Sequence, residues 1–111
     1  MALAALPPQP APMLVYADEY LLNGSRRAGP SGRWRFQLRN NGEDDHDLRI
    51  RRPGGGVLAS TPVIHPSAMG TLRVRLTPGR YTLFCGIANH EARGMIWQLV
   101  VRVPKVRTTA P

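Results

Sequence analysis

Hydrophobic and polar residues alternate along much of the chain, with the period of two that a β-strand with one buried face produces. The clearest segment carries Trp34, Phe36 and Leu38 on one face, with arginine or glutamine at the positions between them. The same alternation recurs over residues 47–51 and 72–77. A weaker alternation predicts a first strand whose apolar positions are Leu14, Tyr16, Tyr20 and Leu22.

Short turn sequences separate these segments. The last segment, residues 95–103, is apolar on both faces in places, which is typical of a more central strand. The turn sequences, rich in glycine, proline and asparagine, are Asn23-Gly24, Gly29-Pro30-Ser31-Gly32, Asn41-Gly42, Pro53-Gly54-Gly55-Gly56, Thr61-Pro62 and Thr77-Pro78-Gly79. Several short strands with such turns predict an all-β protein, an antiparallel Greek-key β-sandwich or small barrel.

The chain of 111 residues has the length of one domain. We expect a flexible Ala- and Pro-rich leader over residues 1–12, a single domain over 13–104 and a flexible tail over 105–111. No stretch of the sequence approaches the roughly 20 apolar residues of a membrane-spanning helix. The single cysteine excludes an intramolecular disulfide.

The chain is basic, because 15 Lys and Arg against 7 Asp and Glu give a net charge of +8. Most arginines occupy the polar positions of the predicted strands, where they would cover a solvated sheet face and discourage edge-to-edge pairing. Nucleic-acid binding often combines basic residues with exposed aromatic ones. No stretch of this sequence interleaves the two, so we expect no nucleic-acid partner.

One segment near the C-terminus concentrates soft metal-binding side chains. Cys85, His90 and Met95 follow one another with four residues between each pair. The first ends a predicted strand, the second lies in a loop and the third begins the next strand, so the three can converge. Thiolate, imidazole and thioether together favour copper, and a second imidazole would complete a plane of two histidines and one cysteine.

His46 is the candidate for that second imidazole. It stands where the Asn41-Gly42 turn leads into a predicted strand, and in a sandwich this position can meet the end of a non-adjacent strand. Taken singly, the four residues have commoner roles: an inert buried cysteine, surface histidines and a core methionine. Their joint occurrence at loops and strand ends favours the metal site.

These residues resemble a known family over about residues 15–103. The chain is similar to the cupredoxins, small blue copper proteins of the plastocyanin-like kind. The family pattern has a turn, Tyr-Thr, a cysteine, a loop ending in histidine and Gly-Met at the start of the last strand, with an asparagine and a histidine far upstream. The matching residues here are Pro78-Gly79, Tyr81-Thr82, Cys85, His90, Gly94-Met95, Leu99 and Val101, and upstream Asn41, His46, Asp47 and Leu48.

The resemblance implies one mononuclear type 1 copper ion held by His46, Cys85 and His90, with Met95 as a weak axial ligand. It implies that the Cys85 thiolate forms the strong bond, and that a backbone donor near Asp47 points toward the sulfur and tunes the potential. It also implies that the edge of His90 lies near solvent and passes electrons to and from partners.

Two positions depart from the family pattern. Ala88-Asn89 stands where relatives often carry Pro-Gly before the histidine, which leaves open how the loop is held rigid. Trp97 stands where a glycine is common, which places a large ring near the last strand. The third histidine, His65, has no ligand spacing to the others, and we expect it in a solvated loop. We expect Met69 to pack.

Electron transfer is the function that this ligand set and the resemblance favour. The protein would cycle Cu(II) and Cu(I) between redox partner proteins and would not be an enzyme. A copper carrier or storage protein would use the same ligands and stays an alternative.

Enzyme classes fit the sequence less well. The copper oxidases and nitrite reductases that resemble this family flank the cysteine with histidine to reach a second copper centre, whereas Cys85 stands between Phe84 and Gly86. A binuclear copper centre would need a second cysteine. A Cys–His hydrolase would need an orienting group and an oxyanion site, which the sequence does not indicate.

We expect a monomer whose redox partner proteins dock at a small apolar patch around His90, and no small-molecule substrate. The patch would comprise Gly86, Ile87, Ala88, Ala92 and Gly94. The basic faces would steer an acidic partner. Beside His46 stands an acidic run of Glu43, Asp44, Asp45 and Asp47, which we interpret as a solvated loop rather than a patch for a basic partner. The resemblance implies a periplasmic or otherwise extracytoplasmic setting, with a membrane tether as one option.

Overall fold

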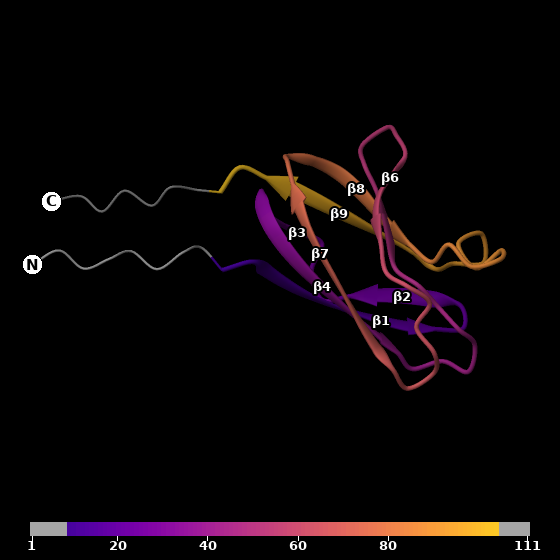
Figure 1. Ribbon diagram of the computed structural model, residues 1–111. Coiled ribbons are helices and arrows are strands. Elements are labelled where there is room, and N and C mark those ends of the chain that lie inside the picture. The colour runs from indigo at the N-terminus through magenta and orange to yellow at the C-terminus, as the bar shows by residue number, and fades with distance from the viewer. Residues whose placement is uncertain (1–8, 105–111) are drawn as a thin grey trace, which may run out of the picture.

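The computed structural model describes residues 9–104, and these residues form nine β-strands (Figure 1). The strands are β1 (Ala11–Asp18), β2 (Leu21–Gly24), β3 (Ala28–Pro30), β4 (Gly32–Asn40), β5 (Arg49–Arg51), β6 (Val57–Ser60), β7 (Met69–Leu76), β8 (Gly79–Phe84) and β9 (Ile96–Arg102).

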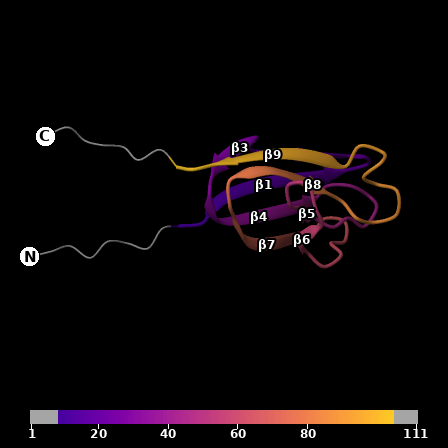
Figure 2. The same cartoon turned by 90° about the horizontal axis from the view of Figure 1, so that it is seen from above.

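The strands form two sheets that pack face to face around one hydrophobic core (Figure 2). Their strand orders are β2-β1-β4-β7 and β3-β9-β8-β5-β6, and this confirms the predicted all-β sandwich. Two pairs, β1–β4 and β3–β9, are parallel, so the sheets are mixed and not wholly antiparallel as the sequence suggested. After β1 and β2, the chain crosses to the other sheet at β3 and returns as β4, and such a crossover lets β4 join β1 in the same direction.

The alternation predicted around Trp34, Phe36 and Leu38 is confirmed in β4. Trp34, Phe36 and Leu38 of β4 are at most 1% exposed, and the Trp34 and Phe36 rings stack with centroids 5.4 Å apart. The strand is central in its sheet because β1 pairs with one of its edges and β7 with the other. The run over residues 95–103 likewise forms a central strand, β9, between β3 and β8.

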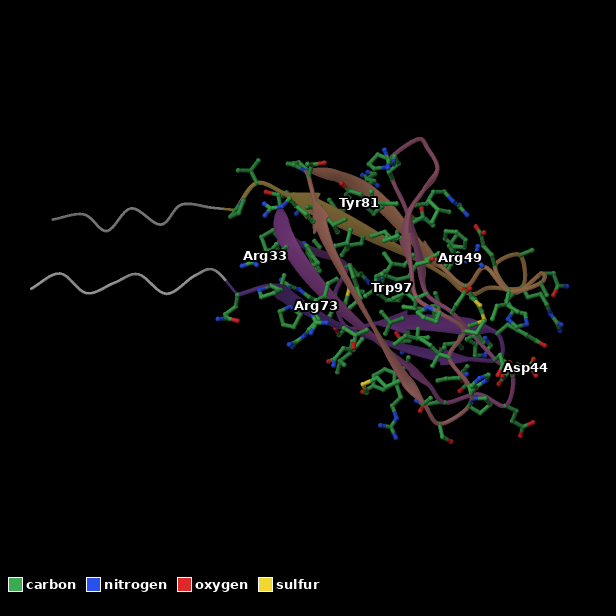
Figure 3. All side chains as sticks on the ribbon, in the orientation of Figure 1. Arg33, Asp44, Arg49, Arg73, Tyr81 and Trp97 are labelled. Carbon is green, nitrogen blue, oxygen red and sulfur yellow. The ribbon has the colours of Figure 1, made fainter. Side chains whose placement is uncertain are left out.

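Arginines gather on the outer face of β4 and β7. Arg33 and Arg35 stand directly opposite Arg75 and Arg73 in the antiparallel register, and Figure 3 shows Arg33 near the start of β4 and Arg73 along β7. The basic charge of the chain is therefore concentrated in part on this face, as the sequence pattern predicted.

A turn at residues 19–20 divides the predicted first strand into β1 and β2, and its predicted apolar positions point inward at Leu22 of β2 but not in β1. The residues of β1 that point into the core are Met13, Val15 and Ala17. Leu14 and Tyr16 are 39% and 41% exposed. Both sets are largely apolar, so the alternation could not tell the two faces apart. The pairing with β4 decides which face of β1 points into the core, because Val15 lies opposite the buried Leu38.

The first strand begins at Ala11, two residues before the domain boundary expected at residue 13, because Ala11 and Pro12 pair with Trp34 and Arg35. Of the expected leader, residues 1–8 lie outside the described residues, as does the expected tail 105–111. Within residues 9–104, no helix has the length and apolarity needed to cross a membrane.

One end of the sandwich gathers the segments that carry the predicted ligands. β1 and β4 end side by side, since Ala17 lies opposite Asn40. β8 ends at Phe84, which lies opposite Arg49 of β5 and Ile96 of β9. The segments 19–20, 41–48 and 85–95 therefore meet at this end, on the right of Figure 1.

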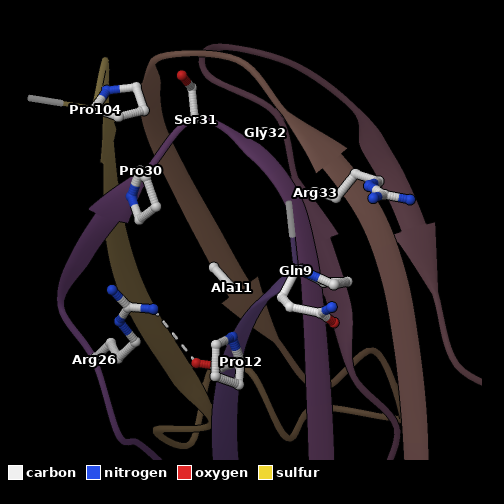
Figure 4. A pocket seen from close by; sticks show the side chains of 10 residues that line it. Gln9, Ala11, Pro12, Arg26, Pro30, Ser31, Gly32, Arg33 and Pro104 are labelled. Carbon is white, nitrogen blue, oxygen red and sulfur yellow. Dashed lines mark hydrogen bonds between the residues drawn. The ribbon is translucent and has the colours of Figure 1, made fainter. Parts of the chain in front are cut away.

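The opposite end holds an open pocket between the start of β1, the turn from β3 to β4 and the residues after β9 (Figure 4). Arg26 reaches across it and donates a hydrogen bond to the carbonyl oxygen of Pro12 at 3.5 Å. The pocket lies at the beginning of β4, whereas the predicted ligand His46 follows its end, so the pocket takes no part in the site described next.

Candidate metal centre

Three buried side chains converge at the ligand-bearing end. The ligand atoms of His46, Cys85 and His90 all lie within 4.8 Å of one another. The sulfur of Cys85 is 3.9 Å from Nδ1 of His46 and 3.6 Å from Nδ1 of His90. His46 and Cys85 are at most 1% exposed and His90 is 7% exposed. The structure thus brings together three of the four residues predicted from the sequence, and both histidines turn the same ring nitrogen toward the sulfur.

Met95, the fourth predicted ligand, is fully buried at the end of the same loop. Its backbone N–H donates to the carbonyl oxygen of His90 at 3.1 Å, and its own carbonyl accepts from the N–H of Cys85 at 3.2 Å. The backbone therefore holds Met95 next to both of these residues. Its role as an axial ligand stays a prediction.

Backbone hydrogen bonds hold the His90 loop in the absence of the Pro-Gly of the family pattern. The N–H of His90 donates to the carbonyl oxygen of Ile87 at 3.0 Å, and Arg93 donates to that of His90 at 3.2 Å. Gly94 has a φ of +128°, and a Cβ there would lie 2.7 Å from the carbonyl oxygen of Tyr20. Only glycine fits this position, so Gly94 lets the loop close tightly against the neighbouring turn.

Asp47 connects the Cys85 sulfur to the strand beside it. Its backbone N–H donates to Sγ of Cys85 at 3.5 Å, as the resemblance implied. Its buried carboxylate accepts from the N–H of Gly86 at 2.7 Å and pairs with the guanidinium of Arg49 at 3.0 Å. Burial raises the pKa of the Cys85 thiol above its usual value. The thiol is therefore protonated at neutral pH without a metal, and metal binding must displace that proton.

Asn40 shapes the loop that presents His46. Its side-chain amide donates to the carbonyl oxygens of Asp44 and Ile64 at 2.8 and 2.9 Å, and its Oδ1 accepts from the N–H of Gly42 at 2.9 Å. His46 and Ile64 also exchange two backbone hydrogen bonds, of 3.1 and 2.7 Å. Because Asn40 is fully buried, its amide fixes the loop from within.

The turn between β1 and β2 contacts both histidines. Oε1 of Glu19 lies 3.1 Å from Nε2 of His46, and the ring of Tyr20 lies against that of His90 with centroids 5.0 Å apart. The backbone N–H of Asp44 donates to Glu19 and holds the pKa of its carboxyl group below the usual value. Glu19 is therefore ionised at neutral pH.

Sequence reasoning missed Glu19, Tyr20 and Asn40. It assigned the upstream asparagine of the family pattern to Asn41, which is exposed. One signal for Asn40 was available, because it follows Leu38 on the inward face of the strand, where an amide must find buried partners. The sequence holds no comparable signal for Glu19, whose contact depends on β1 lying beside β4.

Three other residues singled out in the sequence lie apart from the cluster. The His65 side chain is 76% exposed and its Nδ1 lies 2.8 Å from Oδ1 of Asp45, which agrees with the expected solvated loop. Met69 is 48% exposed at the first position of β7, so its expected packing role is wrong. Trp97 donates its indole N–H to the carbonyl oxygen of Arg26 at 2.8 Å.

No family model and no curated protein match the chain, but solved structures do. Auracyanin B matches 87% of this chain and 93% of its own, with a TM-score of 0.72 and 17% identity. Auracyanin A, a blue copper protein of Chloroflexus aurantiacus, matches 85% of this chain and 100% of its own, with a TM-score of 0.70 and 13% identity. The auracyanin of Roseiflexus castenholzii matches 80% and 94%, with a TM-score of 0.69 and 17% identity.

The chain has the cupredoxin fold. The resemblance drawn from the sequence is thereby confirmed, and the His–Cys–His cluster is consistent with it. A multicopper oxidase also matches, over 86% of this chain at 17% identity with a TM-score of 0.64, although the chain covers only 45% of that protein. The cupredoxin fold therefore occurs both in blue copper proteins and within a larger oxidase.

The cluster in this cupredoxin fold fits copper by the chemistry and spacing of its donors. Ligand atoms placed trigonally at about 2.0–2.3 Å from one ion stand roughly 3.6 Å apart. The two sulfur–nitrogen distances, 3.6 and 3.9 Å, match that spacing. Two imidazoles and one thiolate with a nearby thioether are the set that copper occupies in preference to harder metals.

Proposed function

We propose that this protein transfers single electrons at one mononuclear type 1 copper site. His46, Cys85 and His90 would be the equatorial ligands and Met95 the axial one. The buried His–Cys–His cluster, with donor atoms within 4.8 Å of one another, carries the proposal. Bound copper supplies one-electron exchange between Cu(II) and Cu(I).

The residues around the cluster support this role because their hydrogen bonds hold the ligands in place. The sulfur of Cys85 accepts a hydrogen bond from the N–H of Asp47, and the backbone of Met95 is hydrogen-bonded to those of Cys85 and His90. A preorganised, buried set of ligands changes its geometry little when the charge of the site changes, and it keeps water out. His90, the most exposed of the three clustered ligands, offers electrons a short path to the surface.

Electron exchange and copper release distinguish this proposal from a copper carrier or storage protein. The copper-loaded protein is reduced and reoxidised with small one-electron reagents, and its copper content is measured in both states in the presence of a chelator. We expect fast exchange with full retention of copper. Slow exchange, or loss of copper to the chelator on reduction, would favour the carrier or storage function.

Replacing Met95 with glutamine should leave a coloured site but lower its reduction potential. An amide oxygen is a harder ligand than a thioether and favours Cu(II), and axial ligands tune the potential of such sites. Voltammetry measures the change. Met69→Gln is the matched control, because Met69 is 48% exposed and outside the cluster. A potential equal in both variants would mean that Met95 only packs.

We propose that redox partners dock on the surface around His90. Ala88, Ala92 and Gly94 are exposed there, and the rim is charged: the Arg93 guanidinium lies 3.8 Å from the centre of the Tyr20 ring. A small apolar centre with a charged rim suits a weak, transient complex. We further propose that the protein is not an enzyme and that it acts in an extracytoplasmic setting.

Electrostatic steering makes this docking surface testable. Reduction of the Cu(II) protein by an anionic inorganic complex should slow several-fold as ionic strength rises, because the net charge of +8 attracts it. Arg93→Gln should lower the rate at low salt. Arg73→Gln, which removes the same charge from the middle of β7, away from the His90 loop, should lower it less. A rate independent of salt would remove the steering claim, and equal effects of the two variants would place the docking surface elsewhere.

A further inference from the structure

A single carboxylate oxygen organises the loop in front of His46. Oε1 of Glu19 accepts hydrogen bonds from the backbone N–H groups of Glu43 and Asp44, at 2.8 and 2.6 Å, and it lies 3.1 Å from Nε2 of His46. Gly42 packs closely on the same carboxylate, which a Cβ at that position would overlap. Glu19 directly follows β1, whereas all of these partners belong to the loop after β4.

The geometry of this contact indicates a proton on Nε2 of His46. An ionised carboxylate can only accept hydrogen bonds, so Nε2 must be the donor. In the neutral imidazole Nδ1 then keeps its lone pair, and it is Nδ1 that lies 3.9 Å from the sulfur of Cys85. The His46 side chain is fully buried, so water does not compete for either nitrogen.

The two histidines of the cluster differ in the groups that their rings contact. His90 is 7% exposed and its ring rests against Tyr20, whereas His46 faces a negative charge that is itself held by two backbone donors. A carboxylate on the far side of a ligating imidazole fixes the ring and makes it a stronger donor to a metal.

We propose that Glu19 is a positioning residue of the copper site, which holds His46 ready to bind through Nδ1 and whose charge favours Cu(II) over Cu(I). This inference rests on the copper site proposed above. By favouring Cu(II), the carboxylate lowers the reduction potential. If Glu19 only tied the loop to β1, removing its charge while keeping the loop in place would leave the reduction potential unchanged.

Two substitutions separate the charge of Glu19 from its hydrogen bonds. In Glu19→Gln the amide oxygen can still accept all three hydrogen bonds, but the charge is gone. Glu19→Ala removes both. Glu43→Gln is the matched control, because Glu43 is an exposed acid of the same loop. For each protein, ¹⁵N NMR of the metal-free form gives the His46 tautomer, and copper titration and voltammetry give the Cu(II) affinity and the reduction potential.

We expect the Nε2–H tautomer of His46 in the metal-free wild type and in Glu19→Gln, and a mixture of tautomers in Glu19→Ala. Glu19→Gln should raise the reduction potential, and it should weaken Cu(II) binding by about 10- to 100-fold, as loss of such partners typically does. Glu43→Gln should leave the tautomer unchanged and the potential near that of the wild type.

An Nδ1–H tautomer in the metal-free wild type would overturn the proposal. So would a potential in Glu19→Gln equal to that of Glu43→Gln, because the carboxylate would then be a structural tie alone. If the wild-type protein formed no blue site with copper, the proposed function would fail. The tautomer of the metal-free protein would still decide whether Glu19 positions His46.

Discussion

Replacing Cys85 with serine is expected to abolish the intense visible absorption of the copper-loaded protein and to weaken Cu(II) binding sharply. The band arises from the bond between copper and the thiolate, and serine offers a hydroxyl that is neither soft nor ionised at neutral pH. Serine nearly preserves the volume at this buried position, so the metal-free variant should fold. Its circular dichroism and its absorption after Cu(II) addition are the measurements.

The third histidine provides the control for this experiment. His65→Asn removes an imidazole whose side chain is 76% exposed and which lies apart from the cluster, so the colour should be unchanged. A blue Cys85→Ser protein would contradict the assignment of Cys85 as a copper ligand. Loss of colour in His65→Asn would show that the copper binds elsewhere than at the buried cluster.

Replacing Asn40 with alanine should lower the free energy of unfolding of the metal-free protein by about 2–4 kcal/mol. The substitution removes three hydrogen bonds that a fully buried side chain makes to the loop before His46 and to Ile64, each worth about 1 kcal/mol. Because that loop presents His46, copper affinity should fall as well. Denaturant unfolding without metal isolates the stability effect from the stabilisation that bound copper would add.

The adjacent Asn41 is the matched control for Asn40. It is exposed, and its side chain accepts one hydrogen bond, of 3.2 Å, from Arg39. Asn41→Ala should change the unfolding free energy by no more than about 0.5 kcal/mol, the usual range for surface substitutions. Equal effects of the two substitutions would contradict the role assigned to the buried amide of Asn40.

The sequence predicts the strands whose two faces differ strongly in polarity. In β4, aromatic and aliphatic residues alternate with arginines, so the burial of Trp34 and Phe36 follows from the pattern. In β1 both faces are apolar, and the register with β4 decides which one is buried. The two parallel pairs, β1–β4 and β3–β9, depend on how the chain crosses between the sheets, and no local pattern indicates them.

The candidate site is predictable to the extent that it is local. Cys85, His90 and Met95 share one loop, and their spacing indicates a soft metal site. His46 is 39 residues from Cys85. Its place between a turn and a strand indicates it as the second imidazole, and the family resemblance supports that choice. Glu19 could not be found in this way, because its contact with His46 spans 27 residues and exists only once β1 and β4 lie side by side.

The most direct test of the central claim is to add equimolar Cu(II) to the metal-free protein and to record its visible and electron paramagnetic resonance spectra. A thiolate ligand in a type 1 site gives an intense blue band and an unusually narrow copper hyperfine splitting. We predict both, because Cys85 lies within 4.8 Å of two imidazole ligand atoms in a buried cluster. Faint absorption with the hyperfine splitting of an ordinary cupric complex would contradict the account.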